Sequence, residues 1–460
     1  MKQRTWLIYF PLLIILLVGC FPGCQKETPR KNFILVSLDT VRLDRLSLHG
    51  NKRNVSPKLV ELSKKGLVFD QALTVTENTL ISHASMLTGL YPAAHAATHE
   101  NGGVSLADSY QTIAEDFLNT GEYQTAGFTT HGTWLNRKFG FHQGFQVFSS
   151  GFRSADVVLK EVKQWLKEKR DPKKPYFLFI HLFDAHSDWD GRPYQTVPPF
   201  LNRWTSGYQG RLQDWENMSP NGSIFLAAVN KGRITLTQED ILHIRDQYDE
   251  GLAYTDDRIC DFLEENIDLD DTYVVITADH GEEFKDHDYM LHSSLYDQVV
   301  RVPLIVIPPG NMAKKYKIPR RIPDQVRIVD LRPTILDMAG IDGIQLCQGK
   351  DLNPWMLGRE KNCPAGPAPF YHRALRWEGY KLYKRGENYE LYDLTRDPAE
   401  KVNLIGNETL AARVRKMKAI IQDYARKDRA VRKIVEAMEK GGQSKYSQKD
   451  LEKLRSLGYL

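Results

Sequence analysis

Cysteine is scarce in this chain. The 460 residues contain five, at positions 20, 24, 260, 347 and 363. No two of them have the C-x-x-C spacing of a thiol redox motif or of a zinc ribbon, so neither class of site is expected. Cys347 and Cys363 are close enough in sequence for a local disulfide, and two buried thiols are an equal alternative. None of the five has the sequence surroundings of a catalytic nucleophile.

An excess of charge of one sign is also missing. The formal net charge is +4, with 42% hydrophobic and 26% charged residues. This balance is that of an ordinary globular protein and gives no reason to expect a nucleic-acid partner. The length is sufficient for one large domain and a smaller one.

The apolar run near the N-terminus, Trp6 to Val18, is shorter than the roughly 20 residues that a transmembrane helix requires. Lys2 and Arg4 precede it, which is the pattern of a secretory signal peptide. The run ends in Leu-Val-Gly followed by Cys20, and this sequence resembles a bacterial lipobox.

The lipobox resemblance implies that residues 1–20 are a lipoprotein signal, that the chain is cleaved before Cys20, and that this cysteine is lipidated. Residues 21–30 would then be a polar tether. We therefore expect a protein of the bacterial cell envelope, anchored by lipid outside the cytoplasm, either facing the periplasm or on the outer membrane. An uncleaved anchor and an ordinary secretory signal are the alternatives.

Two apolar runs end at side chains that suit a metal ion. Phe33 to Leu38 is followed by Asp39, and Thr272 to Ala278 is followed by Asp279 and His280. Because ligand groups in α/β sheets lie at the carboxyl ends of strands, these three side chains are predicted to meet. A mixed oxygen and nitrogen ligand set favours zinc or manganese, with calcium or magnesium as the alternatives.

A short helix is predicted shortly after Thr79. Ser82 is a favoured helix N-cap, and Gly89 is a favoured stop. The free N–H groups of a helix start attract anions, so a hydroxyl at this point would face a bound oxyanion. Thr79 is therefore the candidate nucleophile.

The stretch from Thr79 to Gly89 resembles the signature of the sulfatase family, within the alkaline phosphatase superfamily. That signature reads nucleophile, any residue, Pro, Ser, Arg, and then Leu-Thr-Gly; here Thr79 stands first, Ser82 fourth, and Leu-Thr-Gly ends at Gly89. Asp39 and the Asp279-His280 pair match the family's metal-binding positions. The resemblance extends from about residue 31 to the end of the chain, and it implies that Thr79 also ligates the metal.

Several positions depart from the sulfatase signature. Ile81 stands in place of Pro, His83 in place of Arg, and Thr40 in place of a second Asp. A threonine cannot be converted to formylglycine, because its Cβ carries a methyl group and oxidation would give a ketone. An unmodified Thr followed by Ser-His is similar instead to the phosphoethanolamine and phosphoglycerol transferases, and to a bacterial branch of the sulfatases.

Four histidines are assigned roles by this resemblance. His181 and His186 follow or end an apolar strand, where related transferases bind the substrate phosphate. His83 and His292 would act in catalysis, by neutralising charge on the non-bridging oxygens and on the leaving group.

The predicted fold is α/β: a doubly wound, mostly parallel sheet flanked by helices, as in alkaline phosphatase and the sulfatases. Residues 31–345 would form the catalytic domain, and residues 346–460 a smaller α+β subdomain. Two short strands around Gly386, Tyr380 to Lys384 and Glu390 to Leu394, have the pattern of an antiparallel hairpin in that subdomain.

We therefore expect a metal-dependent hydrolase that cleaves phosphate or sulfate esters through Thr79. Phosphoester chemistry is favoured by the residues, because phosphothreonine can be attacked directly at phosphorus. The ester would derive from a glycan or a lipid. Transfer of a phospho group to a lipid or glycan and an inactive binding lipoprotein are the alternatives.

Overall fold

The strands that carry the predicted ligands lie at the centre of an eight-stranded sheet. A computed structural model of the chain describes residues 30–98, 103–187, 193–210, 212, 221–342, 346–440 and 452. The strand order is β10-β2-β9-β6-β1-β5-β3-β4. The strands are β1 (Asn32–Leu38), β2 (Leu67–Leu73), β3 (Gln124–Thr129), β4 (Val147–Ser150), β5 (Tyr176–Leu182), β6 (Thr272–Ala278), β9 (Arg301–Ile307) and β10 (Arg320–Arg327).

Within this sheet, β9 alone among the described strands runs antiparallel to its neighbours, β2 and β6. The pairs β1–β5, β1–β6, β3–β5, β3–β4 and β10–β2 are all parallel. The predicted mostly parallel sheet is thus confirmed. Nearly every residue of β1, β5 and β6 is buried, which explains why these strands are continuously apolar in sequence.

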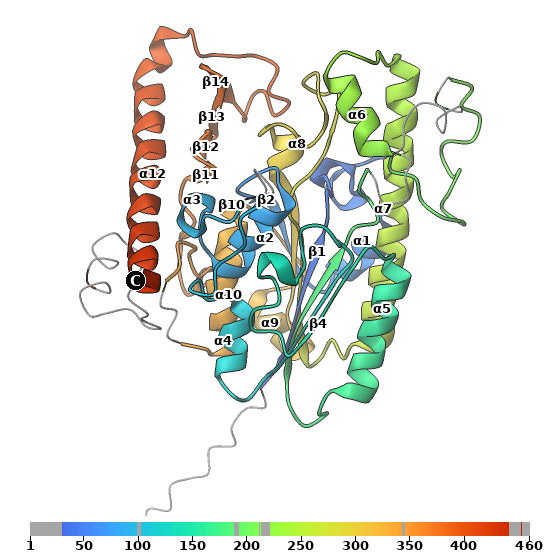
Figure 1. Cartoon of the computed structure of the whole chain (residues 1–460), viewed down its shortest axis with the longest axis vertical. Helices are drawn as coiled ribbons and strands as arrows, with labels where there is room; N and C mark the ends of the chain where they lie inside the picture. The colour runs from blue at the N-terminus through green and yellow to red at the C-terminus, as the bar shows by residue number, and fades with distance from the viewer. Residues whose placement is uncertain are drawn as a thin grey trace, which may run out of the picture. The chain divides into compact units, whose positions relative to one another are not determined.

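Helices cover both faces of the sheet (Figure 1). On one face α1 (Pro57–Ser63) and α5 (Ala155–Gln164) pack against the long α7 (Gln238–Asn266). On the other face α2 (Thr79–Thr88), α4 (Ile113–Asn119) and α10 (Leu331–Ala339) contact one another. This arrangement is the doubly wound architecture that the sequence predicts.

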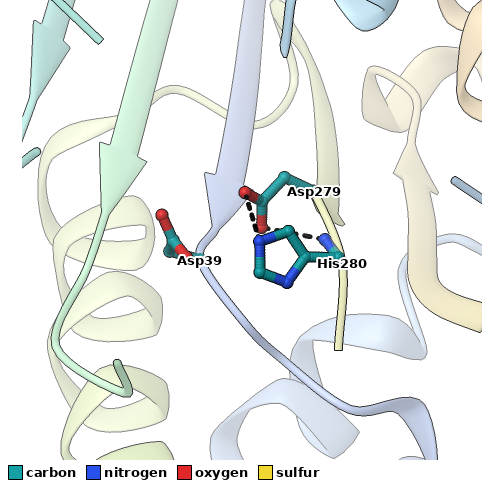
Figure 2. A group of neighbouring side chains, drawn as sticks. All are labelled: Asp39, Asp279 and His280. Atoms are coloured by element: carbon teal, nitrogen blue, oxygen red, sulfur yellow. Dashed lines mark hydrogen bonds and ion pairs between the residues drawn. The ribbon is translucent and has the colours of Figure 1, made fainter. Parts of the chain in front are cut away.

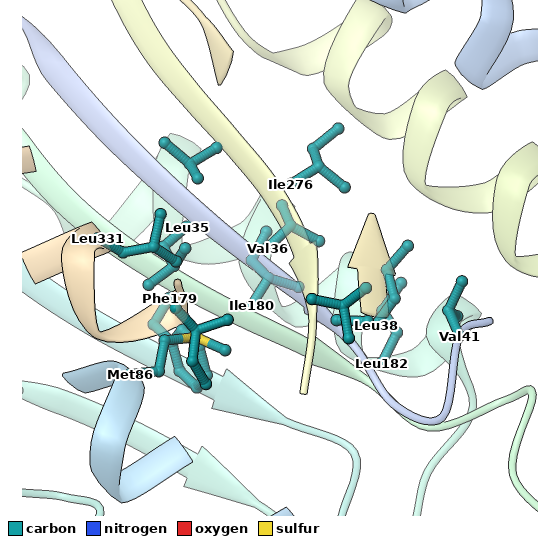
Figure 3. Close-up of a cluster of buried hydrophobic side chains, with 14 of the residues drawn as sticks. Leu35, Val36, Leu38, Val41, Met86, Phe179, Ile180, Leu182, Ile276 and Leu331 are labelled. Carbon is teal, nitrogen blue, oxygen red and sulfur yellow. The ribbon is translucent and has the colours of Figure 1, made fainter. Parts of the chain in front are cut away.

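The hydrophobic core lies between the sheet and these helices. Figure 3 shows part of it: Val36, Ile180 and Ile276 of the three central strands, with Met86 of α2 and Leu331 of α10 in the same buried cluster. Burying such side chains is worth roughly 1.5–3 kcal/mol each, so the central strands and α2 are held firmly in place.

The start of α2 differs from the prediction. The helix begins at Thr79 and not near Ser82, and its N-cap is Asn78, whose side chain accepts a hydrogen bond from the backbone N–H of Ile81 (3.3 Å). It ends as predicted, with Gly89 in the left-handed conformation (φ 68°). Ser82 is unavailable as a cap because its hydroxyl is used in tertiary hydrogen bonds.

A second, four-stranded antiparallel sheet follows in the order β11-β12-β13-β14. Its strands are β11 (Ala368–Phe370), β12 (Ala374–Trp377), β13 (Tyr380–Arg385) and β14 (Asn388–Asp393), and the predicted hairpin is β13–β14. The helix α12 (Ala411–Lys440) packs on this sheet and on α3 (Pro92–His95) (Figure 1).

A buried cluster of charges joins this small sheet to the large domain. Lys381 of β13 is fully buried and pairs with Asp297 (3.1 Å) and Glu400 (3.0 Å), while Arg376 also binds Asp297 (2.7 Å). Asp297 begins α8 (Asp297–Val300), directly before β9. Residues 31–460 accordingly form one unit, and the predicted boundary at residue 345 stays a prediction.

The remaining described elements are short. They include α6 (Gly222–Asn230), α9 (Ala313–Tyr316), α11 (Asn353–Met356) and the two-stranded ribbon β7 (Glu283–Phe284) and β8 (Met290–Leu291). Cys347 and Cys363 are free thiols and not a disulfide, and both are half-buried and not fully buried as the second alternative predicts. No described helix combines the length and the apolarity needed to cross a membrane. Cys20 and the predicted signal lie outside the described residues.

Candidate functional site

The candidate site lies at the carboxyl edge of the central strands. Strands β1 and β6 pair in register, so that Leu38 lies beside Ala278, and Asp39 and Asp279 therefore follow at the same level. Figure 2 shows Asp39, Asp279 and His280 together at the end of β1. Their ligand atoms all lie within 4.8 Å of one another, and all three residues are buried.

His280 has the tautomer that a metal ligand needs. Its Nδ1 lies 2.9 Å from the carbonyl oxygen of Gly281, which can only accept, so Nδ1 carries the proton and Nε2 presents its lone pair. Burial lowers the pKa of His280 to about 4, so the ring is neutral at physiological pH.

Only one of the two oxygens of the Asp279 carboxylate accepts hydrogen bonds from the part of the protein that the structure describes. Oδ1 accepts hydrogen bonds from the backbone N–H groups of Thr40 (3.2 Å) and His280 (2.9 Å). Oδ2 is buried and accepts no hydrogen bond from any described residue. A buried carboxylate oxygen without a donor is costly unless a cation takes that place, so the residues fit a divalent metal.

Thr79 stands at the first position of α2 and faces the metal-binding residues. Its Oγ1 lies 3.3 Å from His280 Nε2. The helix is fixed here by Ser82, whose hydroxyl donates to the Asp279 carbonyl (2.8 Å) and lies 2.9 Å from the Thr74 hydroxyl. These contacts tie the nucleophile position to the end of β6.

His83 lies one helical turn after Thr79, and both of its ring nitrogens are hydrogen-bonded within the protein. Its Nδ1 donates to the Thr79 carbonyl (2.8 Å), and its Nε2 lies 2.8 Å from the Ser37 hydroxyl. The ring is fully buried, and burial lowers its pKa. We expected His83 to neutralise charge on substrate oxygens; since both ring nitrogens are already hydrogen-bonded, the structure places it as a neutral support for α2.

His181 also differs from its expected place. It lies in β5 with its Nε2 3.1 Å from Asp39 Oδ2, and it is fully buried. Burial holds the pKa of its imidazole well below the ordinary value. The sequence predicts a substrate-binding residue here, whereas the structure shows a neutral ring in contact with the candidate metal ligand Asp39, in the position of an outer-shell partner.

His186 and His292 lie together on the more open side of the site. Their ring centroids are 5.5 Å apart, and the ring of His292 is 4.4 Å from that of His280. His292 Nδ1 lies 3.4 Å from Glu282 Oε2. Burial opposes protonation of His292, but the Glu282 carboxylate outweighs it, and the pKa of His292 is raised. The expected roles of His186 and His292 stay predictions.

Three further residues lie at the site, and none of them was assigned a role from the sequence. Glu282 is fully buried beside His292, and its position three residues after Asp279 is the signal that could have identified it. Glu77 precedes Thr79 by two residues and pairs with Arg373, from the turn between β11 and β12. No local pattern marks Arg373, because only the packing of the small sheet brings it here.

Asp184 supports the site without joining it. Its Oδ1 accepts the backbone N–H of Ala155 (3.0 Å) at the first turn of α5, and burial raises the pKa of its carboxyl to about 7.

Because the pKa in the folded state is above the unfolded value of about 4, folding takes up a proton, and this carboxyl makes the protein less stable as pH rises from about 4 to about 7. The resulting loss of folding stability is at most about 4 kcal/mol. We expect Asp184→Asn to lack this dependence, so that the variant gains stability relative to wild type between pH 5 and pH 8 in urea unfolding. If the difference in unfolding free energy between Asp184→Asn and wild type were the same at pH 5 and at pH 8, the raised pKa of Asp184 would be contradicted.

Two family models match the chain. A model described as sulfatase matches residues 31–341, and one described as N-sulphoglucosamine sulphohydrolase, C-terminal, matches residues 285–427. The N-acetylglucosamine-6-O-sulfatase of Bacteroides thetaiotaomicron is 23% identical, over 92% of this chain and 91% of the relative. An arylsulfatase of Clostridium perfringens is 24% identical, over 86% of this chain and 93% of the relative.

Among solved structures, the phosphonate monoester hydrolase of Agrobacterium radiobacter superimposes with a TM-score of 0.67 at 18% identity, covering 87% of this chain and 96% of that one. Because the sequence identity is only 18%, this similarity shows a shared fold and not a shared activity. The α/β architecture with a smaller antiparallel subdomain is therefore shared with this phosphonate monoester hydrolase.

Proposed function

This chain belongs to the sulfatase family of the alkaline phosphatase superfamily and is a hydrolase of that family, and we propose that it attacks its ester substrate with the unmodified hydroxyl of Thr79. The observation that carries the proposal is the position of Thr79 Oγ1, 3.3 Å from the lone pair of His280 Nε2 at the Asp39–Asp279–His280 cluster. The Thr79 hydroxyl therefore lies next to the residues that could hold a cation.

The metal-binding residues in this proposal are Asp39, Asp279, His280 and Thr79. When bound, a divalent ion would lower the pKa of the Thr79 hydroxyl and neutralise charge on the ester oxygens. Zinc and manganese are favoured because an imidazole nitrogen takes part, and calcium or magnesium are the alternatives.

The reaction then follows from the residues around Thr79. The hydroxyl proton passes to water, and Oγ1 forms a bond to the phosphorus or sulfur atom as the bond from that atom to the alcohol oxygen breaks. His292, held through its Nδ1 by Glu282, donates a proton to the departing oxygen. Water next attacks the phosphorus or sulfur atom of the Thr79 ester and gives one proton to Oγ1, which restores the hydroxyl, and the proton that passed to water in the first step returns to His292. His83 and His181 act as positioning residues, and His186 would contact the substrate.

Phosphoesters are the favoured substrates. A sulfatase with formylglycine releases sulfate by breaking a hemiacetal at carbon, and the methyl group of Thr79 excludes that route. A phosphothreonine can be attacked directly at phosphorus, so the residue present suits phosphate better than sulfate. The sulfatases among the relatives support sulfate esters, including those of sugars, as the second class of substrate.

The place of the enzyme in the cell is also a proposal. The lipobox resemblance at Cys20 supports a lipid anchor on the outside of the cytoplasmic membrane or on the outer membrane. A glycan- or lipid-derived ester at the cell envelope would then be within its reach.

The proposal predicts a covalent adduct on Thr79. We expect that full-length protein, mixed with an aryl phosphate and quenched in acid, carries a phosphoryl group on Thr79 when its fragments are analysed by mass spectrometry. A parallel sample with an aryl sulfate tests for a sulfo group, and Thr79→Ala is the matched control. Turnover of either ester without any adduct on Thr79, in a quench series shorter than one turnover, would show that water attacks directly.

A further inference from the structure

One aromatic side chain at the edge of the site is conspicuously exposed. Phe152, in the loop between β4 and α5, has 62% of its surface exposed. Among the large hydrophobic side chains of the described residues it is the most exposed and the only exposed aromatic ring. A Phe ring in water forgoes a large amount of favourable burial, so its position requires an explanation.

The loop holds Phe152 firmly in this position. The guanidinium of the next residue, Arg153, donates to the Thr129 carbonyl (2.8 Å), the Ser149 hydroxyl (3.0 Å) and Glu161 (2.6 Å). On the other side, a Cβ added to Gly132 would lie 2.9 Å from the Phe152 ring, so the ring packs directly on the backbone of the loop after β3. One face of the ring is therefore supported by protein while much of the ring remains accessible.

A continuous row of rings leads from Phe152 to the nucleophile. The centroid of Phe152 is 6.0 Å from that of Phe183, and Phe183 stacks on His186 at 4.2 Å. His186 lies 5.5 Å from His292, which is 4.4 Å from His280, the neighbour of Thr79. Phe152 is thus the outer end of the side of the site that carries the proposed proton donor for the leaving alcohol.

We propose that Phe152 is a specificity-determining residue whose ring forms one wall of the leaving-group subsite and stacks on a flat ring of the substrate alcohol. This inference rests on the proposed function, since the leaving alcohol departs on the His292 side. The shared chemistry is a ring with an apolar face, and its two sources are an aryl group and the C–H face of a sugar. An acyclic alcohol lacks such a face and gains little from Phe152.

The first experiment measures kcat/KM of the full-length protein on three esters of the same acid: a phenyl ester, a sugar 6-ester and an n-butyl ester. We expect Phe152→Ala to lower kcat/KM about tenfold on one or both ring esters and less than about twofold on the butyl ester, given the usual worth of an aromatic contact. Phe152→Tyr keeps the ring and should retain activity. Leu242→Ala, on the exposed side of α7, is the control for loss of an exposed apolar side chain.

Comparing the loss of kcat/KM on the phenyl ester with the loss on the sugar ester shows whether the ring that stacks on Phe152 is an aryl group or a sugar. An equal loss on all three esters, or no loss on either ring ester, would overturn the subsite. A second measurement separates this outcome from failure of the proposed function. Calorimetry measures the binding of phenyl phosphate, phenyl sulfate and the sugar esters to two proteins, the Thr79→Ala variant and the double variant Thr79→Ala, Phe152→Ala. Tighter binding that depends on Phe152 supports the subsite even in a chain that turns over no ester, and binding that is independent of Phe152 rejects it.

Discussion

Replacing Thr79 with Ala is expected to lower kcat/KM by at least about 1000-fold, the range that loss of a catalytic nucleophile typically produces. The side chain is 4% exposed and its Oγ1 has one described contact, with His280 Nε2, so removing it takes away the nucleophile without disturbing the core. The cap of α2 belongs to Asn78 and its anchor to Ser82, and neither changes in the variant. The measurement is steady-state turnover of aryl phosphates and aryl sulfates, with thermal unfolding to establish that the variant is folded.

Thr79→Ser is the matched control for this experiment. It keeps the hydroxyl and removes only the methyl group, so we expect it to retain activity within about tenfold of wild type and to form the same adduct. A Thr79→Ala variant that keeps most of its turnover would place the nucleophile elsewhere. In that case a water held at the Asp39–Asp279–His280 cluster would be the remaining candidate.

Asp279→Asn is expected to have the second largest effect, through loss of the metal. The amide can still accept the two backbone hydrogen bonds at Oδ1, so the local fold should be kept. At the position of Oδ2 an NH₂ group would replace an anionic oxygen and could not ligate a cation. We expect the metal content, measured by elemental analysis, to fall close to zero and kcat/KM to fall by at least about 1000-fold.

Asp184→Asn supplies the matched control for Asp279→Asn. Asp184 is also a buried aspartate just beyond a central strand, but it serves α5 and is absent from the metal cluster. We expect it to leave metal content unchanged. Treating the wild type with a chelator should reproduce the loss of activity, and adding back zinc, manganese, calcium or magnesium separately identifies the ion. Full activity of a chelated, metal-free protein would exclude a metal-dependent mechanism.

The fold and the metal cluster could be predicted from sequence because their signals are local. The apolar runs of β1 and β6 are buried on both faces, and such strands deliver their next residues, Asp39 and Asp279, to one edge of the sheet. The family model confirms the sulfatase relationship that the Thr79 stretch indicated. The helix start could not be placed correctly, because Asn78 and Ser82 are both good caps and only the tertiary contact of Ser82 with the Asp279 carbonyl decides between them.

For the histidines, too, the sequence indicated their location, and only the tertiary structure indicated what each ring contacts. Sequence placed His83 and His181 near the site, but whether a ring faces the substrate or supports a neighbour depends on which groups surround its two nitrogens. Ser37 and the Thr79 carbonyl occupy both nitrogens of His83, and Asp39 takes Nε2 of His181. Those partners come from distant segments, and no spacing in the sequence specifies them.

By itself the sequence determined the central strands, the candidate metal ligands at their ends and the threonine proposed as the nucleophile, since each follows from the pattern of a short segment. Only the tertiary structure decided what surrounds them. Arg373 contacts Glu77 because the small sheet is fixed to the large domain through Lys381 and Asp297. Phe152 lies at the outer end of the row of rings that leads to His280 because Arg153 and Gly132 hold its loop there. Such contacts join residues far apart in the chain, and their free energy depends on packing that no local pattern contains.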